Sequence, residues 1–180
     1  MILERHDKTN PECSNEQNTN YFKYYADWIP QRTKGLVLDI GCGYGYLTKL
    51  VAENEKVVSI EATDKIDING KQEEDDKITY HRIRTEDLIK DNWKKFDTII
   101  STEHIEHLEE KYHEPLLKWI KENLKEGGVF LGSMPNVENS GNFYHLKEYL
   151  ISDWEKLLKK YFNNVEIFCP NHLIYIWSAS

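Results

Sequence analysis

Two carboxylates and an imidazole lie close together in the segment Glu103-His-Ile-Glu-His107. Glu103, Glu106 and His107 occupy positions i, i+3 and i+4, so in one helical turn their side chains would share a face. Carboxylate oxygens suit hard divalent ions and imidazole suits borderline ones, so this set could bind a metal. It could equally supply a general base or position an acceptor, or it could be purely structural. The spacing alone leaves these interpretations open.

A second chemical pattern is the run Asp39-Ile-Gly-Cys-Gly-Tyr-Gly45. An apolar stretch, 36–40, precedes it and an amphipathic stretch, 46–53, follows, which predicts a strand, a tight turn and a helix. Glycine has no Cβ and tolerates positive φ, and the helix start directs free N–H groups into the same gap, so a ligand can approach the main chain there. The spacing differs from that of dinucleotide and triphosphate loops, which argues against both ligands.

The glycine run resembles the first motif of class I S-adenosylmethionine (SAM)-dependent methyltransferases. The resemblance covers roughly residues 20–180. It implies an α/β fold: a single-domain, Rossmann-like sheet of seven strands in the order 3-2-1-4-5-7-6, with one antiparallel strand. The predicted strands and helices alternate along the chain as this fold requires.

The same resemblance implies where the cofactor binds. The glycine loop would wrap the methionine part, which Asp39 would orient, and Glu61, predicted to end the second strand, would bind the ribose. Thr85 and Glu86 would lie beside the adenine, although Asp87 could serve as well and a helix N-cap is an alternative interpretation. The full expected cofactor site comprises Asp39, Gly41, Gly43, Gly45, Glu61, Thr85, Glu86 and Ser101.

Other elements are predicted from periodicity and turn residues. The remaining strands are expected at 56–60, 78–83, 96–101, 129–134, 165–168 and 173–177. Helices are expected from near Pro115 to 124, stopped by glycines at 125–128, and at 153–162. The segment 64–76 reads as turn and loop where the family has a helix. Residues 135–142 form a polar loop after the fifth strand.

The E-x-x-E-H pattern also resembles two methyltransferase groups. One is the ubiquinone-pathway-like O-methyltransferases, and the other is the small-RNA 3′-terminal 2′-O-methyltransferases, in which two Glu and two His hold a metal. The second His comes from the loop after strand five, here His145. We therefore expect His107 and His145 to act on the acceptor, supported by Glu103 and Glu106. Those four residues would be the ligands if a divalent ion such as Mg²⁺ or Mn²⁺ is bound.

These patterns predict a SAM-dependent methyltransferase that methylates oxygen of a small or medium polar acceptor, such as a phenol, quinone precursor or sugar. Metal-dependent 2′-O-methylation at an RNA terminus and a catalytically silent SAM-binding partner subunit are the alternatives. The net charge of −8 and pI of about 5.4 make nucleic acid an unlikely partner.

Chain length, apolar runs and cysteine content indicate the number of domains and the cellular compartment. The chain of 180 residues suits one domain, predicted at 19–180 after a flexible segment, 1–18. No run of residues is long and apolar enough to span a membrane, and the N-terminus shows no signal peptide. Three widely spaced cysteines favour a reducing cytoplasm over a disulfide scaffold.

Two further expectations concern side chains outside these motifs. Aromatic residues at 21, 24, 25 and 28 form a helical stripe that would either pack on the sheet or cover the ligand site. His104 and His113 fall off the face shared by the E-x-x-E-H residues, so we expect both to be solvated.

Overall fold

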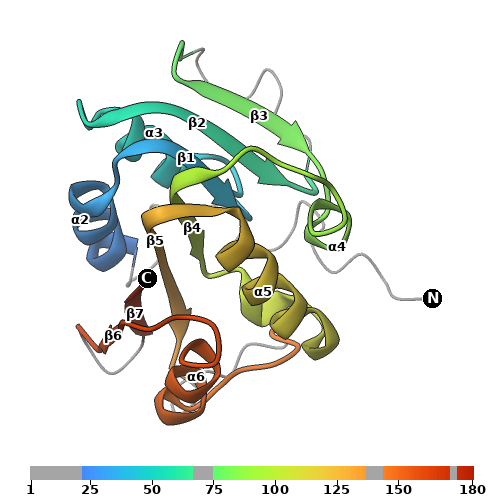
Figure 1. Ribbon diagram of the computed structural model, residues 1–180. Coiled ribbons are helices and arrows are strands. Elements are labelled where there is room, and N and C mark those ends of the chain that lie inside the picture. Colours follow the sequence, from blue (N-terminus) through green and yellow to red (C-terminus); the bar gives the residue numbers. More distant parts are fainter. Residues whose placement is uncertain (1–21, 67–74, 137–143, 171–173) are drawn as a thin grey trace.

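The computed structural model describes residues 22–66, 75–136, 144–170 and 174–180 (Figure 1). The predicted flexible segment, 1–18, lies outside these residues, as does most of the predicted loop at 64–76. None of the described helices is long and apolar enough to cross a membrane.

The described chain builds one seven-stranded sheet in the order β3-β2-β1-β4-β5-β7-β6. Its strands are β1 Gly35–Ile40, β2 Val57–Asp64, β3 Ile78–Arg82, β4 Phe96–Thr102, β5 Leu124–Pro135, β6 Val165–Phe168 and β7 Ile174–Ala179. Strands β1 to β5 pair in parallel, and β7 runs antiparallel to both of its neighbours. The predicted strand order and antiparallel strand are confirmed.

Helices cover both faces of this sheet (Figure 1). They are α2 Phe22–Arg32, α3 Tyr46–Ala52, α4 Thr85–Leu88, α5 His113–Asn123 and α6 Ile151–Leu158, with 3₁₀ turns η2 Ile105–His107 and η3 Glu110–Tyr112. Because side chains alternate along a strand, β1 sends Leu38 and Ile40 into one hydrophobic cluster and Val37 into another.

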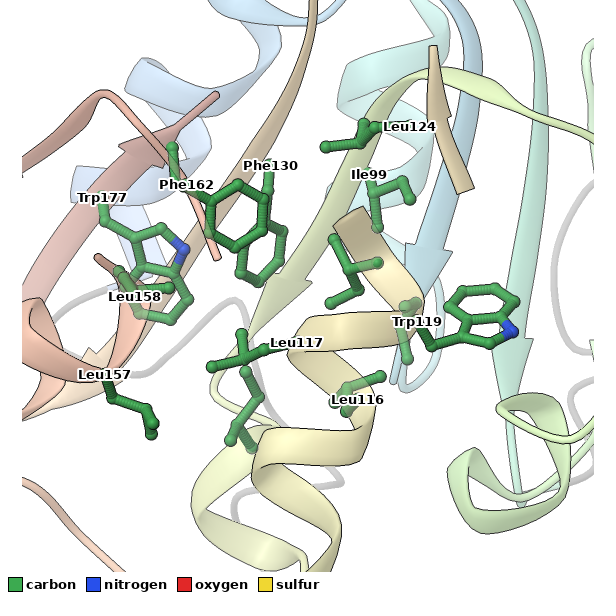
Figure 2. Packing of buried hydrophobic residues seen from close by; sticks show 14 of the residues in the cluster. Ile99, Leu116, Leu117, Trp119, Leu124, Phe130, Leu157, Leu158, Phe162 and Trp177 are labelled. Atoms are coloured by element: carbon green, nitrogen blue, oxygen red, sulfur yellow. The ribbon is translucent and has the colours of Figure 1, made fainter. Parts of the chain in front are cut away.

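The larger cluster lies under α5 and α6 (Figure 2). The apolar positions 116, 117 and 120 of α5 are fully buried there, because residues three and four apart share a helix face. The opposite cluster is covered by α2 and α3 and includes Tyr25 and Ile29 of α2. Burial on both faces explains why the central strands read as apolar runs.

The described part of the aromatic stripe packs against the body of the protein. Tyr25 is 4% exposed, and the Trp28 ring lies 5.2 Å from that of Phe168 on β6. These contacts favour packing over a cover for the ligand site. Residue 21, the first of the stripe, lies outside the described residues.

Two strands are longer than the sequence predicted. Strand β2 continues three residues beyond Glu61 to Asp64, because β3 pairs with it up to Asp64. Strand β5 begins at Leu124, immediately after α5, so the predicted glycine stop at 125–128 is part of a strand. A bulge against β4 accommodates the extra residues, and Lys125 Nζ there lies 2.7 Å from Asp97 Oδ2.

Candidate functional site

The glycine turn lies between β1 and α3, at the carboxyl edge of the sheet. Its glycines have φ angles of 76° (Gly41), 56° (Gly43) and 77° (Gly45), all in the left-handed region that other residues rarely adopt. The backbone N–H groups of Gly41 and Cys42 donate to Thr63 O at 2.8 and 3.0 Å, which anchors the turn to β2. The predicted strand, turn and helix are therefore present.

Two carboxylates flank this turn, the buried one of Asp39 and the partly exposed one of Asp64. Asp39 is 2% exposed and accepts a hydrogen bond of 2.7 Å from Thr48 Oγ1, while Asp64 Oδ2 accepts one of 2.9 Å from the N–H of Gly43. Burial raises the pKa of Asp39 to about 7, with a further contribution from the charge of Asp64. Burial also raises the pKa of Asp64. A cationic ligand would stabilise both acids in their ionised form.

The strand-end acid is Asp64, whereas the sequence predicted that β2 ends at Glu61. Glu61 lies inside the strand, and its carboxylate contacts His81 Nε2 at 2.6 Å and also pairs with Lys94 Nζ. Burial works to raise the pKa of Glu61, but the bonds to Lys94 and His81 outweigh it and lower the pKa. Asp64 is therefore the acid that touches the glycine turn, and sequence reasoning missed it.

Three more residues of the expected cofactor site, Thr85, Glu86 and Ser101, differ in their burial and contacts. Thr85 is 7% exposed at the start of α4, and its Oγ1 lies 2.8 Å from His104 Nε2. Glu86, in the same turn, is partly exposed. Ser101 is fully buried inside β4, and its hydroxyl has no hydrogen-bond partner among the described residues.

His104 is not the solvated side chain that the sequence predicted. Besides its contact with Thr85, its ring lies directly against Gly41, where any Cβ would overlap it. His104 itself is partly exposed, whereas His113 is buried, at 1% exposure. Its Nε2 lies 3.1 Å from Leu108 O and its Nδ1 lies 2.9 Å from Tyr149 Oη. Burial lowers the pKa of His113, so it is a structural histidine in its neutral form.

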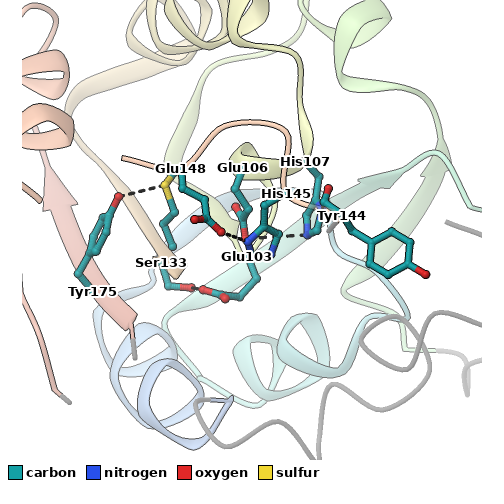
Figure 3. Close-up of polar contacts among 9 residues, drawn as sticks. Glu103, Glu106, His107, Ser133, Tyr144, His145, Glu148 and Tyr175 are labelled. Carbon is teal, nitrogen blue, oxygen red and sulfur yellow. Dashed lines mark hydrogen bonds and ion pairs between the residues drawn. The ribbon is translucent and has the colours of Figure 1, made fainter. Parts of the chain in front are cut away.

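A separate cluster joins Glu106, His107 and His145 (Figure 3). One ligand atom from each lies within 4.8 Å of the others, and the two imidazole rings are 4.9 Å apart. Glu106 is fully buried. Because Glu106 and His107 follow β4 whereas His145 follows β5, the parallel sheet brings them together at one edge.

Hydrogen bonds orient both imidazoles of this cluster. His107 Nδ1 lies 3.1 Å from Tyr144 O, and His145 Nδ1 bonds to the carboxylate of Glu148. An acceptor at Nδ1 favours the tautomer with its proton there, which leaves the lone pair on Nε2. Glu148 was not singled out in the sequence, although its position three residues after His145 was a usable signal.

Glu103 does not join the other three predicted metal ligands. Its carboxylate accepts a 2.7 Å hydrogen bond from Ser133 Oγ, and Figure 3 shows it turned toward that residue. The predicted single helical turn is absent, because Glu103 has a φ of 46° and the chain then makes only a short 3₁₀ turn. Glu103 therefore lies outside the group of Glu106, His107 and His145.

The methyltransferase domain family model matches residues 15–180. Among solved structures, the chain resembles the N-methyltransferase NodS from Bradyrhizobium japonicum WM9, determined with S-adenosylhomocysteine, with a TM-score of 0.74 at 11% identity. The match covers 95% of this chain and 92% of NodS. Curated protein sequences returned no match.

Two other solved structures show how widely this fold is shared. Human N-acetylserotonin methyltransferase, in complex with SAM, matches with a TM-score of 0.70 at 16% identity, over 88% of this chain and 52% of that one. The methyltransferase domain of bacterial CtHen1 matches with a TM-score of 0.65 at 18% identity, over 88% and 96%. At these identities the likeness shows the fold alone, and the family match carries the assignment. The chain therefore belongs to the methyltransferase domain family and, with this sheet and glycine turn, is a class I SAM-dependent methyltransferase.

Proposed function

We propose that this enzyme transfers the methyl group of SAM to a hydroxyl oxygen of a small or medium polar molecule. The observation that carries the proposal is the cluster of Glu106, His107 and His145 at the carboxyl edge of the sheet. A hydroxyl must lose its proton as it attacks the methyl carbon, and imidazoles supported by a carboxylate are suited to remove it. Proteins of this fold include N-methyltransferases such as NodS, so the proposal of an oxygen acceptor rests on the cluster and not on the fold.

The cofactor would bind at the glycine turn. SAM carries a sulfonium and an ammonium, and the carboxyl groups of Asp39 and Asp64 beside the turn would supply negative charge when ionised. The left-handed glycines expose the main chain, which suits the methionine carboxylate. Asp64, rather than Glu61, is the acid we assign to the ribose hydroxyls, because Asp64 touches the turn whereas Glu61 pairs with Lys94 and His81.

The same cluster fits a divalent ion. Its donors are one carboxylate and two imidazoles, and the imidazoles are held through Nδ1 by Tyr144 O and the Glu148 carboxylate. Such outer hydrogen bonds are typical of histidines that ligate metals through Nε2. Glu106, His107 and His145 would hold the ion, and Glu103 would need to leave Ser133 to join them. When bound, the ion would lower the pKa of the acceptor hydroxyl.

Small molecules are the acceptors we propose, in preference to nucleic acid. The chain carries a net charge of −8, so it offers no general attraction for a polyanion. The resemblance to the methyltransferase domain of CtHen1 is a likeness of fold and does not alter this.

The test is formation of S-adenosylhomocysteine from SAM with panels of matched hydroxyl and amine acceptors. We expect turnover with hydroxyl acceptors only, its loss in excess chelator, and its return with Mg²⁺ or Mn²⁺. His107→Ala should abolish turnover while calorimetry shows unchanged SAM affinity. Glu109→Gln, which changes a partly exposed carboxylate paired with Lys111, is the matched control and should behave as wild type.

Two results would contradict parts of this proposal. Methylation of amines and not of hydroxyls would overturn the assignment of an oxygen acceptor. Full activity in chelator, with no metal found by elemental analysis, would remove the ion and leave His107 or His145 as a general base.

A further inference from the structure

His104 links three segments that meet at the cofactor end of the site. It follows β4 and occupies the position just before the 3₁₀ turn η2. Its Nε2 lies 2.8 Å from Thr85 Oγ1 at the start of α4, and its ring lies against Gly41 in the turn between β1 and α3. One imidazole therefore connects the β4 loop, α4 and the glycine turn.

The contact with Gly41 gives that glycine a second reason to lack a side chain. Its φ of 76° already disfavours other residues, and a Cβ would also overlap Cγ and Nδ1 of the His104 ring. The imidazole is thus seated directly on the turn.

The location of the pair favours a role toward the ligand. In open α/β sheets, ligands bind outside the carboxyl ends of the strands, where β1 and β4 both end. Gly41 follows β1 and lies in the turn assigned to the methionine part of SAM, while Thr85 starts the segment expected beside the adenine. His104 therefore spans the distance between the two halves of the cofactor site.

We propose that His104 is a positioning residue for SAM, which holds Thr85 and the glycine turn in one fixed arrangement before the cofactor binds. Preorganisation of this kind increases affinity, because the ordering cost is not incurred during binding. The role is distinct from that of His107 and His145 at the acceptor. The proposal rests on SAM as the cofactor. It does not depend on which atom of the acceptor receives the methyl group.

The test measures SAM and S-adenosylhomocysteine affinity by calorimetry, with no acceptor present. His104→Val and Thr85→Val should each weaken both ligands at least tenfold. The double variant should be no weaker than either single variant, because both changes remove the same link. His104→Gln, whose amide can reach Thr85, should recover part of the affinity.

Two controls separate positioning from general stability. Thr98→Val removes a buried threonine hydroxyl that bonds to the backbone of Lys34, far along β4 from this edge. It should lower the melting temperature without changing SAM affinity. Thr85→Ser keeps the hydroxyl and should bind SAM more tightly than Thr85→Val does. If His104→Val fails to fold, the difference between Thr85→Ser and Thr85→Val decides the question.

Unchanged SAM affinity in folded His104→Val and Thr85→Val would overturn the proposal. Tighter binding in His104→Val would also overturn it, because the ring would then be an obstacle that SAM must displace. Neither result would affect the acceptor assignment, which is tested by turnover and chelation.

Discussion

The proposed cofactor end and the proposed acceptor end of this site are built in different ways. The glycine turn is one continuous segment whose shape follows from three left-handed glycines and two main-chain bonds to Thr63. The acceptor cluster joins Glu106 and His107 to His145, nearly forty residues later in the chain. The residues of the turn are therefore contiguous in the chain, whereas those of the cluster come together only once β4 and β5 are paired. Changes at the turn should affect cofactor binding, and changes in the cluster should affect turnover alone.

The sharpest test of this division is Gly43→Val. A β-branched residue at a φ of 56° would distort the turn and disturb the N–H that bonds to Asp64, so we expect SAM binding to become undetectable by calorimetry. Gly127→Ala is the matched control, because Gly127 has a φ of 71° but no neighbour within 4 Å of a Cβ. It should cost about 1 kcal/mol of stability and leave SAM affinity intact. Measurable SAM binding by folded Gly43→Val would contradict the local character of the site.

The converse test is Glu106→Gln in the acceptor cluster. Loss of this buried carboxylate should lower kcat by about 10²–10⁴-fold, the usual range for positioned acid–base help. SAM affinity should stay within twofold of wild type, since Glu106 lies outside the glycine turn. Steady-state kinetics and calorimetry on the same preparation measure the two effects. A loss of SAM affinity equal to the loss of kcat would show that the two ends are not separable.

A smaller effect is expected near the end of β2, where Asp64 and Glu61 are the two candidates for the acid that binds the ribose. Asp64→Asn should weaken SAM binding by about 1–3 kcal/mol, the scale of a hydrogen bond to a charged group. Glu61→Gln should change affinity less than twofold, because Glu61 is paired with Lys94 and His81. The opposite ranking in calorimetry would return the ribose to Glu61, as the sequence predicted.

The smallest effect concerns the pH dependence set by Asp39. Its pKa of about 7 means that below this value SAM must first displace a proton, so affinity should rise up to about tenfold per pH unit as pH increases toward 7. The Asp39→Asn variant should bind SAM more weakly and show a flatter profile. A wild-type affinity that is constant between pH 6 and 8 would refute a role for this proton.

The same carboxyl also affects stability without ligand. Because its folded pKa is raised above 3.8, folded protein holds more protons than unfolded protein between about pH 4 and 7. Stability from this group therefore falls as pH rises through that window. Ligand-free Asp39→Asn should consequently melt at a higher temperature than wild type at pH 8, and an equal or lower melting temperature would contradict the raised pKa.

Features that depend on neighbouring residues could be predicted from the amino-acid pattern. Three glycines at alternate positions permit the left-handed turn that is found, and apolar runs with strand–helix alternation indicate the parallel sheet. The order of seven strands followed from the family's first motif. These features were predictable because each rests on local geometry or on a pattern shared by the whole family.

Which side chains meet depends on how the whole chain folds. Pairing with β3 extends β2 to Asp64 and places that acid on the turn, while Glu61 is drawn to Lys94 and His81. The left-handed backbone at Glu103 separates it from the cluster. His104 reaches Gly41 through the same folded arrangement. Strand register and loop conformation fix these contacts, and both depend on partners far away in the chain.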